Sequence, residues 1–265
     1  MRRIPIVTIL AALVVIVAAP AAAQREDTFR WSGQLAAGKT LEVRGLNGNI
    51  EARPASGRTV EIVALKKGEK DDPRTVDVEV IEEADGIRVC AIYPGEDGDR
   101  VNTCGSSGHD DNGDNIDEND VVVDFTVSVP SGVVFDAGTV NGGIDVSGLQ
   151  ADVRVSSVNG GIEVASSGTV EASTVNGSIK ASTGSASWSG TLDFQTVNGS
   201  ITLTLPAGAS ASISAETVNG GFSSDFPLTV EAGRWGPKRV HGTIGSGGGR
   251  LNLETVNGGI AIRKS

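Results

Sequence analysis

Apolar and polar residues alternate along most of the chain after residue 29. Val153, Val155 and Ser157 fall on one face of an extended segment, and Leu251 and Leu253 do the same in another. A period of two in segments rich in β-branched residues predicts β-strands, because successive side chains of a strand point to opposite faces. No segment beyond residue 23 keeps helical spacing over three turns. The sequence therefore predicts an all-β protein.

One short motif interrupts the strands at regular intervals: a valine, then Asn-Gly, a small residue, and Ile or Phe. Copies begin at Val140, Val158, Val175, Val197, Val218 and Val256, with a degenerate copy at Val240 and an outlying early copy at Leu46. From Val140 onward the copies are 18, 17, 22, 21, 22 and 16 residues apart. Such self-similarity is typical of stacked repeats. Each repeat is predicted to be a strand, an Asn-Gly turn, a strand and a second turn.

Two architectures fit this unit. An Asn-Gly pair between two strands is the strongest local signal for a β-hairpin, and consecutive hairpins would form a meander. In a β-solenoid, by contrast, each repeat forms one coil, and equivalent residues of neighbouring coils stack about 4.8 Å apart. We favour a single-chain β-solenoid of about seven or more coils, because stacking gives a reason for identical turns, whose aligned amides can bond to one another.

The solenoid interpretation predicts a structural column in which successive turns lie over one another. Its members are Asn141, Gly142, Asn159, Gly160, Asn176, Gly177, Asn198, Gly199, Asn219, Gly220, His241, Gly242, Asn257 and Gly258. His241 stands where the other copies have asparagine. We interpret it as a turn residue and not a catalytic group, since histidine is also enriched at positive φ.

The chain divides into three parts. Residues 1–23 resemble a secretory signal peptide, with two arginines, an apolar run from Ile6 to Ala19 and an A-x-A cleavage pattern. Residues 24–130 are expected to form an N-terminal β cap or the first coils, and residues 131–265 the regular solenoid. The apolar run is too short for a transmembrane helix, so we expect no membrane span after cleavage, with a retained N-terminal anchor as the alternative. Export would place the protein in the periplasm, in the cell envelope or outside the cell.

Export also changes the interpretation of the two cysteines, Cys90 and Cys104. In an oxidising compartment they are expected to form a disulfide, with two free thiols as the alternative. The net charge of −11 becomes −13 when residues 1–23 and their two arginines are removed, since 22 − 2 − 33 = −13. This charge excludes nonspecific binding to the phosphate backbone of nucleic acids.

An acidic insertion at residues 94–120 interrupts the strand pattern. Nine acids and one arginine lie between Glu96 and Asp120, which gives a net charge of −8. Clustered carboxylates suit calcium, and Asp110, Asp114 and Asp117 are the candidate ligands. Residue 115 is asparagine, however, where a helix–loop–helix calcium site beginning at Asp110 requires glycine. We therefore expect a solvated loop and assign no metal and no cofactor.

Residues 33–40 match the phosphate-binding pattern G-x-x-x-x-G-K-[ST] letter for letter. That chemistry needs a helix after the loop, because the amides at the N-terminus of the helix hold the phosphates. Here the next residues predict a strand followed by a turn, so we expect no nucleotide binding.

The composition offers few of the residues that most often act in catalysis, since the chain has only two histidines and two cysteines. A solenoid would nevertheless place Asp145 and Glu163 one coil apart on the outer surface, near the carboxyl separation of a retaining glycosidase. The next residue of that column is Lys180. One acid of such a pair needs a pKa raised by burial, and these outward positions are expected to be solvated. A solvated charged column is the simpler interpretation.

Several segments together resemble a known family. They are the repeat itself, residues 87–94 (IRVCAIYP), residues 121–130 (VVVDFTVSVP) and residues 224–228 (SDFPL). The chain resembles a bacterial β-strand-repeat family of unknown function whose members are called adhesins by inference from their fold. The resemblance implies an exported, single-chain β-solenoid and brings no catalytic residues with it.

The sequence leads to a functional expectation with two alternatives. The main expectation is an exported, non-enzymatic β-solenoid, an adhesin or binding scaffold of the cell envelope, with a protein or glycan surface as its partner. One alternative is a carbohydrate-active enzyme, a polysaccharide lyase or glycosidase, on the same scaffold. The other is a periplasmic assembly or sensing component. Because the end strands of a stack have a free edge, self-association through the solenoid ends is a further expectation.

Overall fold

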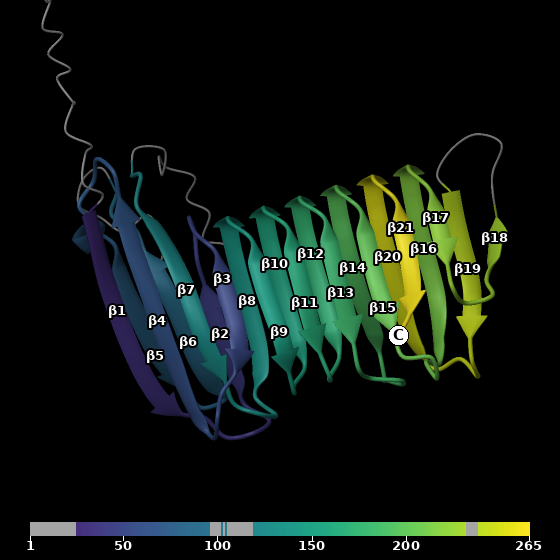
Figure 1. The fold of residues 1–265 in the computed structure, drawn as a ribbon, viewed down its shortest axis with the longest axis horizontal. Coiled ribbons are helices and arrows are strands. Elements are labelled where there is room, and N and C mark those ends of the chain that lie inside the picture. The colour runs from purple at the N-terminus through teal and green to yellow at the C-terminus, as the bar shows by residue number, and fades with distance from the viewer. Residues whose placement is uncertain (1–24, 96–101, 103, 105–118, 232–237) are drawn as a thin grey trace, which may run out of the picture.

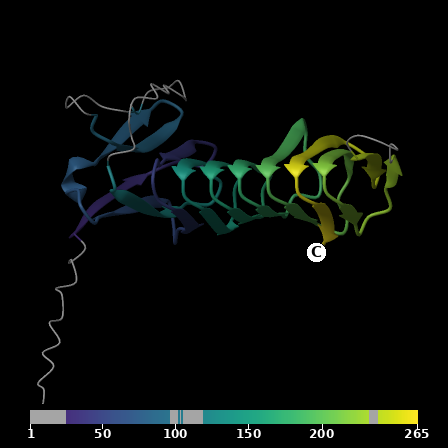
Figure 2. The same cartoon turned by 90° about the horizontal axis from the view of Figure 1, so that it is seen from above.

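A computed structural model describes residues 25–95, 102, 104, 119–231 and 238–265 of the chain. The predicted signal peptide lies outside the described residues. Two long mixed β-sheets face each other, and the chain passes from one to the other (Figures 1 and 2). The described helical structure is one short 3₁₀ helix, η1 (Pro73–Thr75), and no described helix is long and apolar enough to cross a membrane. The predicted all-β class is confirmed.

The first sheet has ten strands in the part of the chain that the structure describes. In spatial order they are β1 (Arg25–Gln34), β4 (Thr59–Gly68), β7 (Val122–Val129), β3 (Ile50–Pro54), β9 (Ile144–Leu149), β11 (Ile162–Ser166), β13 (Ile179–Thr183), β15 (Ile201–Leu205), β21 (Ile260–Lys264) and β17 (Phe222–Ser224).

The second sheet has eleven strands among the described residues. In spatial order they are β18 (Thr229–Glu231), β19 (Lys238–Ile244), β16 (Ala211–Asn219), β20 (Gly249–Asn257), β14 (Thr191–Asn198), β12 (Val170–Asn176), β10 (Val153–Asn159), β8 (Val134–Asn141), β2 (Thr40–Arg44), β6 (Gly86–Ile92) and β5 (Asp77–Glu83).

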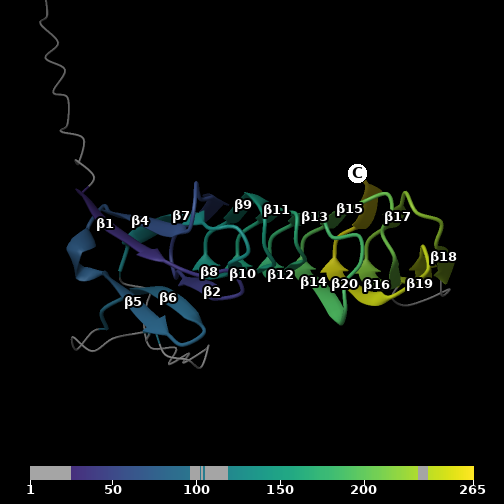
Figure 3. The ribbon, with the colours of Figure 1, turned by 90° about the horizontal axis from the view of Figure 1, so that it is seen from below.

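Each repeat contributes one strand to the second sheet, crosses over at its Asn-Gly turn and continues in the first sheet. β10, for example, pairs in parallel with β8 on one side and with β12 on the other. The register keeps equivalent residues level, so that Asn159 lies between Asn141 and Asn176. A hairpin meander would instead pair the two strands of one repeat with each other. The repeats stack in a solenoid-like manner, and Figure 3 shows the connections crossing between the layers.

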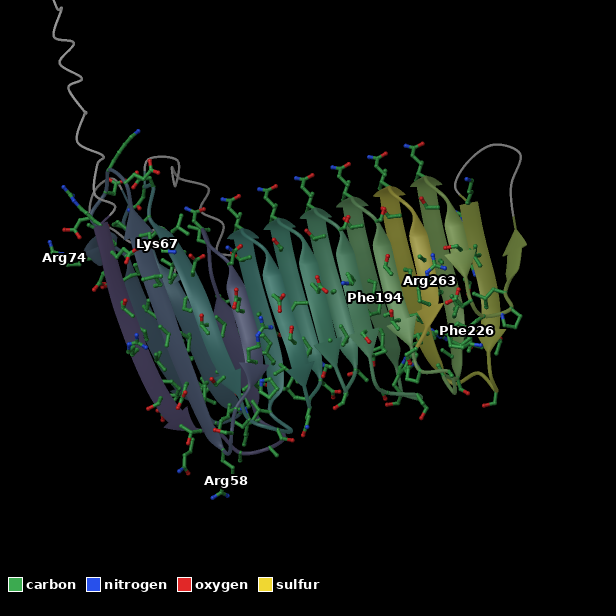
Figure 4. All side chains as sticks on the ribbon, in the orientation of Figure 1. Arg58, Lys67, Arg74, Phe194, Phe226 and Arg263 are labelled. Carbon is green, nitrogen blue, oxygen red and sulfur yellow. A yellow bond between two sulfur atoms is a disulfide. The ribbon has the colours of Figure 1, made fainter. Side chains whose placement is uncertain are left out.

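The core lies between the two sheets, where the inward residues of each strand meet. Val153 and Val155 are buried as their alternation predicts, and Phe135 and Phe194 are fully buried (Figure 4 labels Phe194). Near the turns the inward residue is serine or threonine, and its hydroxyl donates to the carbonyl of the glycine in the neighbouring turn. These pairs are Thr139–Gly48, Ser157–Gly142, Thr174–Gly160, Thr196–Gly177, Thr255–Gly199 and Thr217–Gly258, with oxygen–oxygen distances of 2.8–3.1 Å.

The order of the coils differs from the order of the sequence at the C-terminal end. β20 lies between β14 and β16, and β21 lies between β15 and β17. The last repeat of the chain is therefore inserted between two earlier ones, as the yellow strands among the green ones show (Figure 1). Because every repeat carries the same turn, any repeat can in principle stack on any other.

The degenerate copy of the repeat does not form a turn of the column, so the prediction for His241 and Gly242 is wrong. Both residues lie within β19, which pairs antiparallel with β16 and places His241 opposite Ser214. Gly242 approaches the side chain of Leu228, and a methyl group there would lie 2.6 Å from it. As an antiparallel strand, β19 covers the edge of β16 on the side away from β20, which would otherwise be unpaired.

The N-terminal end is built differently from the regular stack. β1, β4 and β7 pair antiparallel in the first sheet, while β5 and β6 pair antiparallel in the second. Cys90, on the outer side of β6, forms a disulfide with Cys104, as predicted. The side-chain amide of Asn102 makes two hydrogen bonds at the end of β6. Its oxygen accepts from the backbone N–H of Tyr93, and its nitrogen donates to the carbonyl of Ala91. These contacts hold part of the acidic insertion against β6.

Candidate binding surface along the stacked turns

A continuous ladder of side-chain amides runs along the turns. Along the row, the Nδ2 of each asparagine donates to the Oδ1 of the preceding one at 2.8–2.9 Å, beginning with Asn141, which donates to Asn47. The spatial order is Asn47, Asn141, Asn159, Asn176, Asn198, Asn257 and Asn219. Figure 4 shows a row of side chains that projects beyond the strand ends along the upper edge of the molecule. The structure thus brings all the predicted asparagines together and adds Asn47 from the outlying early copy.

The glycine after each asparagine is required by close stacking. Gly142, Gly160, Gly177, Gly199 and Gly258 each lie so close to the carbonyl of the neighbouring turn glycine that a methyl group would overlap it, and Gly220 does the same against Gly258. None of these residues has a positive φ. Distance between coils therefore explains the glycine, and not the left-handed conformation that a hairpin turn would need.

A stripe of exposed valines lies beside the amide ladder on the second sheet. Its members are Val158, Val175, Val197, Val256 and Val218, whose exposed fractions are 37–44%. Each precedes a ladder asparagine, so the ladder's register places the five valines in one file across five coils. The exposure of these valines could have been predicted from the alternation of the strand, because Val158 is an odd number of positions from the buried Val153 and Val155 and so points to the opposite face. Sequence reasoning missed it.

The valine stripe forms one wall of a shallow groove of about 410 Å³. The groove crosses β12, β14, β20 and β16, and is lined by Val175, Val197, Val256 and Val218 together with the polar residues Gln195, Glu254 and Glu216. Glu216 accepts from Arg239 at 2.9 Å, and Glu254 accepts from Asn252 at 3.0 Å. We call this feature the valine groove. The valine groove is open to solvent, with apolar side chains along one wall and hydrogen-bonding side chains beside them.

A second hollow, of about 440 Å³, lies on the other side of the turns over the first sheet. It arises where Gly143 and Gly161 carry no side chain, and Glu51, Asp145 and Glu163 line it. Asp145 and Glu163 lie opposite each other on neighbouring strands. The carboxylates are thus next to each other, as the glycosidase alternative requires.

The electrostatics of that pair do not suit acid catalysis. Arg53 donates to Asp145 at 2.6 Å, and this hydrogen bond holds the pKa of Asp145 below its usual value against the opposing effect of partial burial. Lys180 donates to Glu163 at 2.6 Å, which raises the pKa of the lysine. A general acid needs the opposite shift, a carboxyl pKa raised by an apolar environment. Both carboxylates are therefore arranged as partners of cations.

Glu171, on the outer face of β12, has the raised pKa that Asp145 lacks. Partial burial raises the pKa of Glu171, the nearby Arg154 lowers it, and Asp193 and Asp136 raise it further. Glu171 lies in the lining of a hollow of about 400 Å³, together with Arg44, Asp136, Arg154 and Asp193. Asp136 and Asp193 line the same hollow, and we assign Glu171 no reaction.

The other sequence candidates are placed as follows. Asp110, Asp114 and Asp117 lie outside the described residues, and among the residues that are described no group of three or more His, Cys, Asp or Glu side chains could hold a metal. The phosphate-binding pattern at residues 33–40 spans the end of β1, a turn with Gly38 at φ 81°, and the first residue of β2. A strand follows the loop, as the sequence predicts.

Comparison with solved structures finds distant similarities. A "putative cell adhesion protein" from Clostridium sporogenes is 12% identical, covers 90% of this chain and 100% of that one, and gives a TM-score of 0.40. A "putative adhesin" from Bacteroides fragilis is 10% identical, with 90% and 97% covered and a TM-score of 0.32. A "putative adhesin" from Parabacteroides merdae is 9% identical, with 91% and 95% covered and a TM-score of 0.23. At these values they carry no argument about function.

Comparison with curated protein sequences finds no match. The family model Toastrack DUF4097 matches residues 120–263, which is more than half of the chain. The matched region contains the amide ladder from Asn141 onward and the whole valine stripe. The resemblance drawn from the sequence, to a β-strand-repeat family of unknown function, is confirmed: the chain belongs to the Toastrack DUF4097 family.

Proposed function

We propose that this chain is an exported, non-enzymatic binding scaffold of the cell envelope, a β-solenoid of seven stacked coils that holds an extended partner along the valine groove. The observation that carries the proposal is the valine stripe. Single exposed apolar residues are ordinary on protein surfaces, but a contiguous row marks an interaction site. Five valines from five coils form such a row beside an unbroken ladder of amides.

Rigidity supports the same proposal. The coils are joined by parallel pairing in both sheets, by the amide ladder and by the hydroxyl–carbonyl bonds inside the turns. A surface built on such strands is held in place before a partner arrives, so little conformational entropy is lost on binding. The groups also repeat at the strand spacing of about 4.8 Å, which suits a partner that is itself extended and repetitive.

We infer that the partner is an uncharged polysaccharide. Sugar rings have apolar C–H faces that pack on aliphatic side chains, and their hydroxyls bond to amides and carboxylates such as Gln195, Glu254 and Glu216, which line the groove. The expected charge of −13 after removal of residues 1–23 disfavours a polyanionic partner. The ion pairs Arg53–Asp145 and Lys180–Glu163 support binding without turnover, because both carboxylates serve as partners of cations.

Export is supported by the sequence of residues 1–23 and by the predicted disulfide between Cys90 and Cys104, which is of the kind that persists in oxidising compartments. Fractionation of cells that produce the full chain tests it. We expect a product shortened at its N-terminus in the periplasm, on the envelope or in the medium. A full-length product in the cytoplasm would contradict export.

Binding is tested with the exported protein and insoluble envelope polysaccharides. The double substitution Val197→Ser and Val256→Ser removes adjacent apolar side chains from the centre of the groove. We expect at least about a tenfold loss of affinity, since each side chain gives up roughly 0.7–1 kcal/mol of apolar contact. Val122→Ser is the matched control, because Val122 is also 37% exposed but lies on β7 of the first sheet.

The outcomes separate the functional classes. Equal binding by the groove variant and the control would contradict the groove as the site. Release of new sugar ends, abolished by Asp145→Asn or Glu163→Gln, would establish the carbohydrate-active enzyme instead. Recovery of a defined protein complex with no affinity for polysaccharide would favour an assembly or sensing component.

A further inference from the structure

The N-terminal end of the molecule carries a long strand with one free edge. β1 has ten residues and pairs only with β4, among the strands that the structure describes. At the opposite end of the two sheets, the edge strands β17 and β18 have three residues each. An edge strand presents unpaired N–H and C=O groups, and its capacity to accept a new strand grows with its length. β1 is therefore the main open edge of the first sheet.

Charge distinguishes β1 from the other N-terminal edge. β5 has the sequence DVEVIEE, with four acids and no base, so two copies of β5 would repel each other. β1 has the sequence REDTFRWSGQ, with two acids and two arginines. Its outer face exposes Glu26, Thr28, Arg30, Ser32 and Gln34. Within this face, one acid and one base, Glu26 and Arg30, lie symmetrically about Thr28.

We propose that two copies of this chain pair through β1 in antiparallel orientation, with the register centred on Thr28, so that their first sheets join into one continuous sheet. This goes beyond the proposed binding function and does not depend on it. In this register Thr28 lies opposite Thr28 of the second copy, and Glu26 lies opposite Arg30 of the second copy on both sides of the two-fold axis. Opposite charges placed directly across two strands stabilise their pairing.

Neighbouring registers lack this complementarity. A pairing centred on Asp27 places two aspartates opposite each other, and one centred on Arg30 places two arginines opposite each other; like charges in these positions destabilise the pair. A pairing centred on Phe29 sets Glu26 opposite Ser32 and Thr28 opposite Arg30, without an ion pair. Of the pairings centred on residues 27–30, the one centred on Thr28 alone sets acids opposite bases.

The inner face of β1 supports the same register. Phe29 and Trp31 pack against the core but are only partly buried, because β1 is the last strand of the first sheet within the described part of the chain. In the proposed pair the two Phe29 rings become diagonal neighbours, and Trp31 lies opposite Arg25 of the second copy, where the guanidinium can stack on the indole. The inward charge of Asp27 does not oppose this contact, because Asp27 forms an ion pair with Lys66, which also donates to the Val76 carbonyl at 3.0 Å.

Analytical ultracentrifugation of the exported protein measures the dimer and its dissociation constant. Arg30→Glu places two acids opposite each other at both sides, and we expect it to weaken the dimer by at least about tenfold. The double variant Glu26→Arg with Arg30→Glu restores the complementarity, and we expect an affinity within about threefold of the wild type. A monomeric wild type, or a double variant as weak as Arg30→Glu, would overturn the proposal.

Cysteine cross-linking tests the register independently of affinity. Directly opposite residues of antiparallel strands have Cα atoms about 4.5–5.5 Å apart, within the range that a disulfide spans. Thr28→Cys is expected to form a covalent dimer under mild oxidation, whereas Ser32→Cys, exposed on the same face, is not. A covalent dimer of the Ser32 variant alone would show another register and overturn the assignment. Thermal melting confirms that each variant is folded.

Discussion

At the scale of single residues, the turn of this protein is governed by the distance between coils. In each turn, the residue after the asparagine has no room for a side chain, because the backbone of the neighbouring coil lies against its Cα. The asparagine amide then bonds to its counterparts above and below, at 2.8–2.9 Å. Each such bond contributes about 1 kcal/mol, and the ladder links every coil to its neighbours.

This account predicts different effects for two adjacent glycines. In Gly160→Ala the new methyl would overlap the carbonyl of Gly142, and we expect a loss of about 1–3 kcal/mol in the free energy of unfolding. In Gly161→Ala the nearest atom is the Ser178 carbonyl oxygen at 3.6 Å, an ordinary contact, and we expect a change within about 0.5 kcal/mol.

Neither glycine has a positive φ, so backbone strain does not separate the two variants. Denaturant unfolding measures both. Equal stability of the Gly160 and Gly161 variants would mean that the coils are not stacked as closely as described.

The residues of the turn show what the sequence reveals and what it conceals. Repetition of Asn-Gly predicted the amide ladder, because only a stack explains identical turns. It did not predict the role of His241, since a residue that suits a turn also suits the exposed face of a strand. The exposed valines were missed for a related reason: the repeat made Val158 and its equivalents look like part of the core pattern, although the parity of the strand places them outside.

At the scale of single elements, β6 is unusual because both of its faces are buried. Val89 and Ala91 face the main core, whereas Cys90 and Ile92 form a small separate cluster with Cys104. Partly buried Ile81 of β5 packs against this cluster. The disulfide therefore fastens a segment of the acidic insertion over a strand whose outer side would otherwise expose apolar residues.

Removal of the disulfide is expected to cost stability. In the chain-entropy model, closing a loop of 14 positions contributes about 3 kcal/mol. We expect the double variant Cys90→Ser with Cys104→Ser to unfold at lower denaturant concentration than the wild type, by about this free energy. The wild type measured with a reductant is the control, and it should match the variant. An unchanged midpoint in both would show that the bond is dispensable.

At the scale of the whole molecule, the order of the coils is the feature that could not be predicted from the repeat pattern. The turns are equivalent, so the repeat pattern alone allows β16 to stack directly on β14. Contacts outside the repeat break this degeneracy. The indole of Trp188, in the connection before β14, donates to the Arg250 carbonyl at 3.0 Å and lies against Gly249, where a side chain would clash. These contacts favour β20 as the neighbour of β14.

The valine groove depends on this order. Its lining residues come from β12, β14, β20 and β16, so the last repeat of the chain supplies Val256 and Glu254 to the middle of the groove. A stack in sequence order would leave these residues at the end. The insertion of the C-terminal coil is therefore the claim on which both the fold and the proposed binding surface rest.

Disulfide trapping between outward residues tests that claim most directly. Gln195 lies opposite Glu254 on neighbouring strands, and Glu254 lies opposite Glu216. At about 4.8 Å per strand, Gln195 and Glu216 are about 9.6 Å apart, beyond the reach of a disulfide. The account predicts that Gln195→Cys with Glu254→Cys forms a bond within one molecule, and that Gln195→Cys with Glu216→Cys does not. A bond in the second pair and none in the first would contradict it.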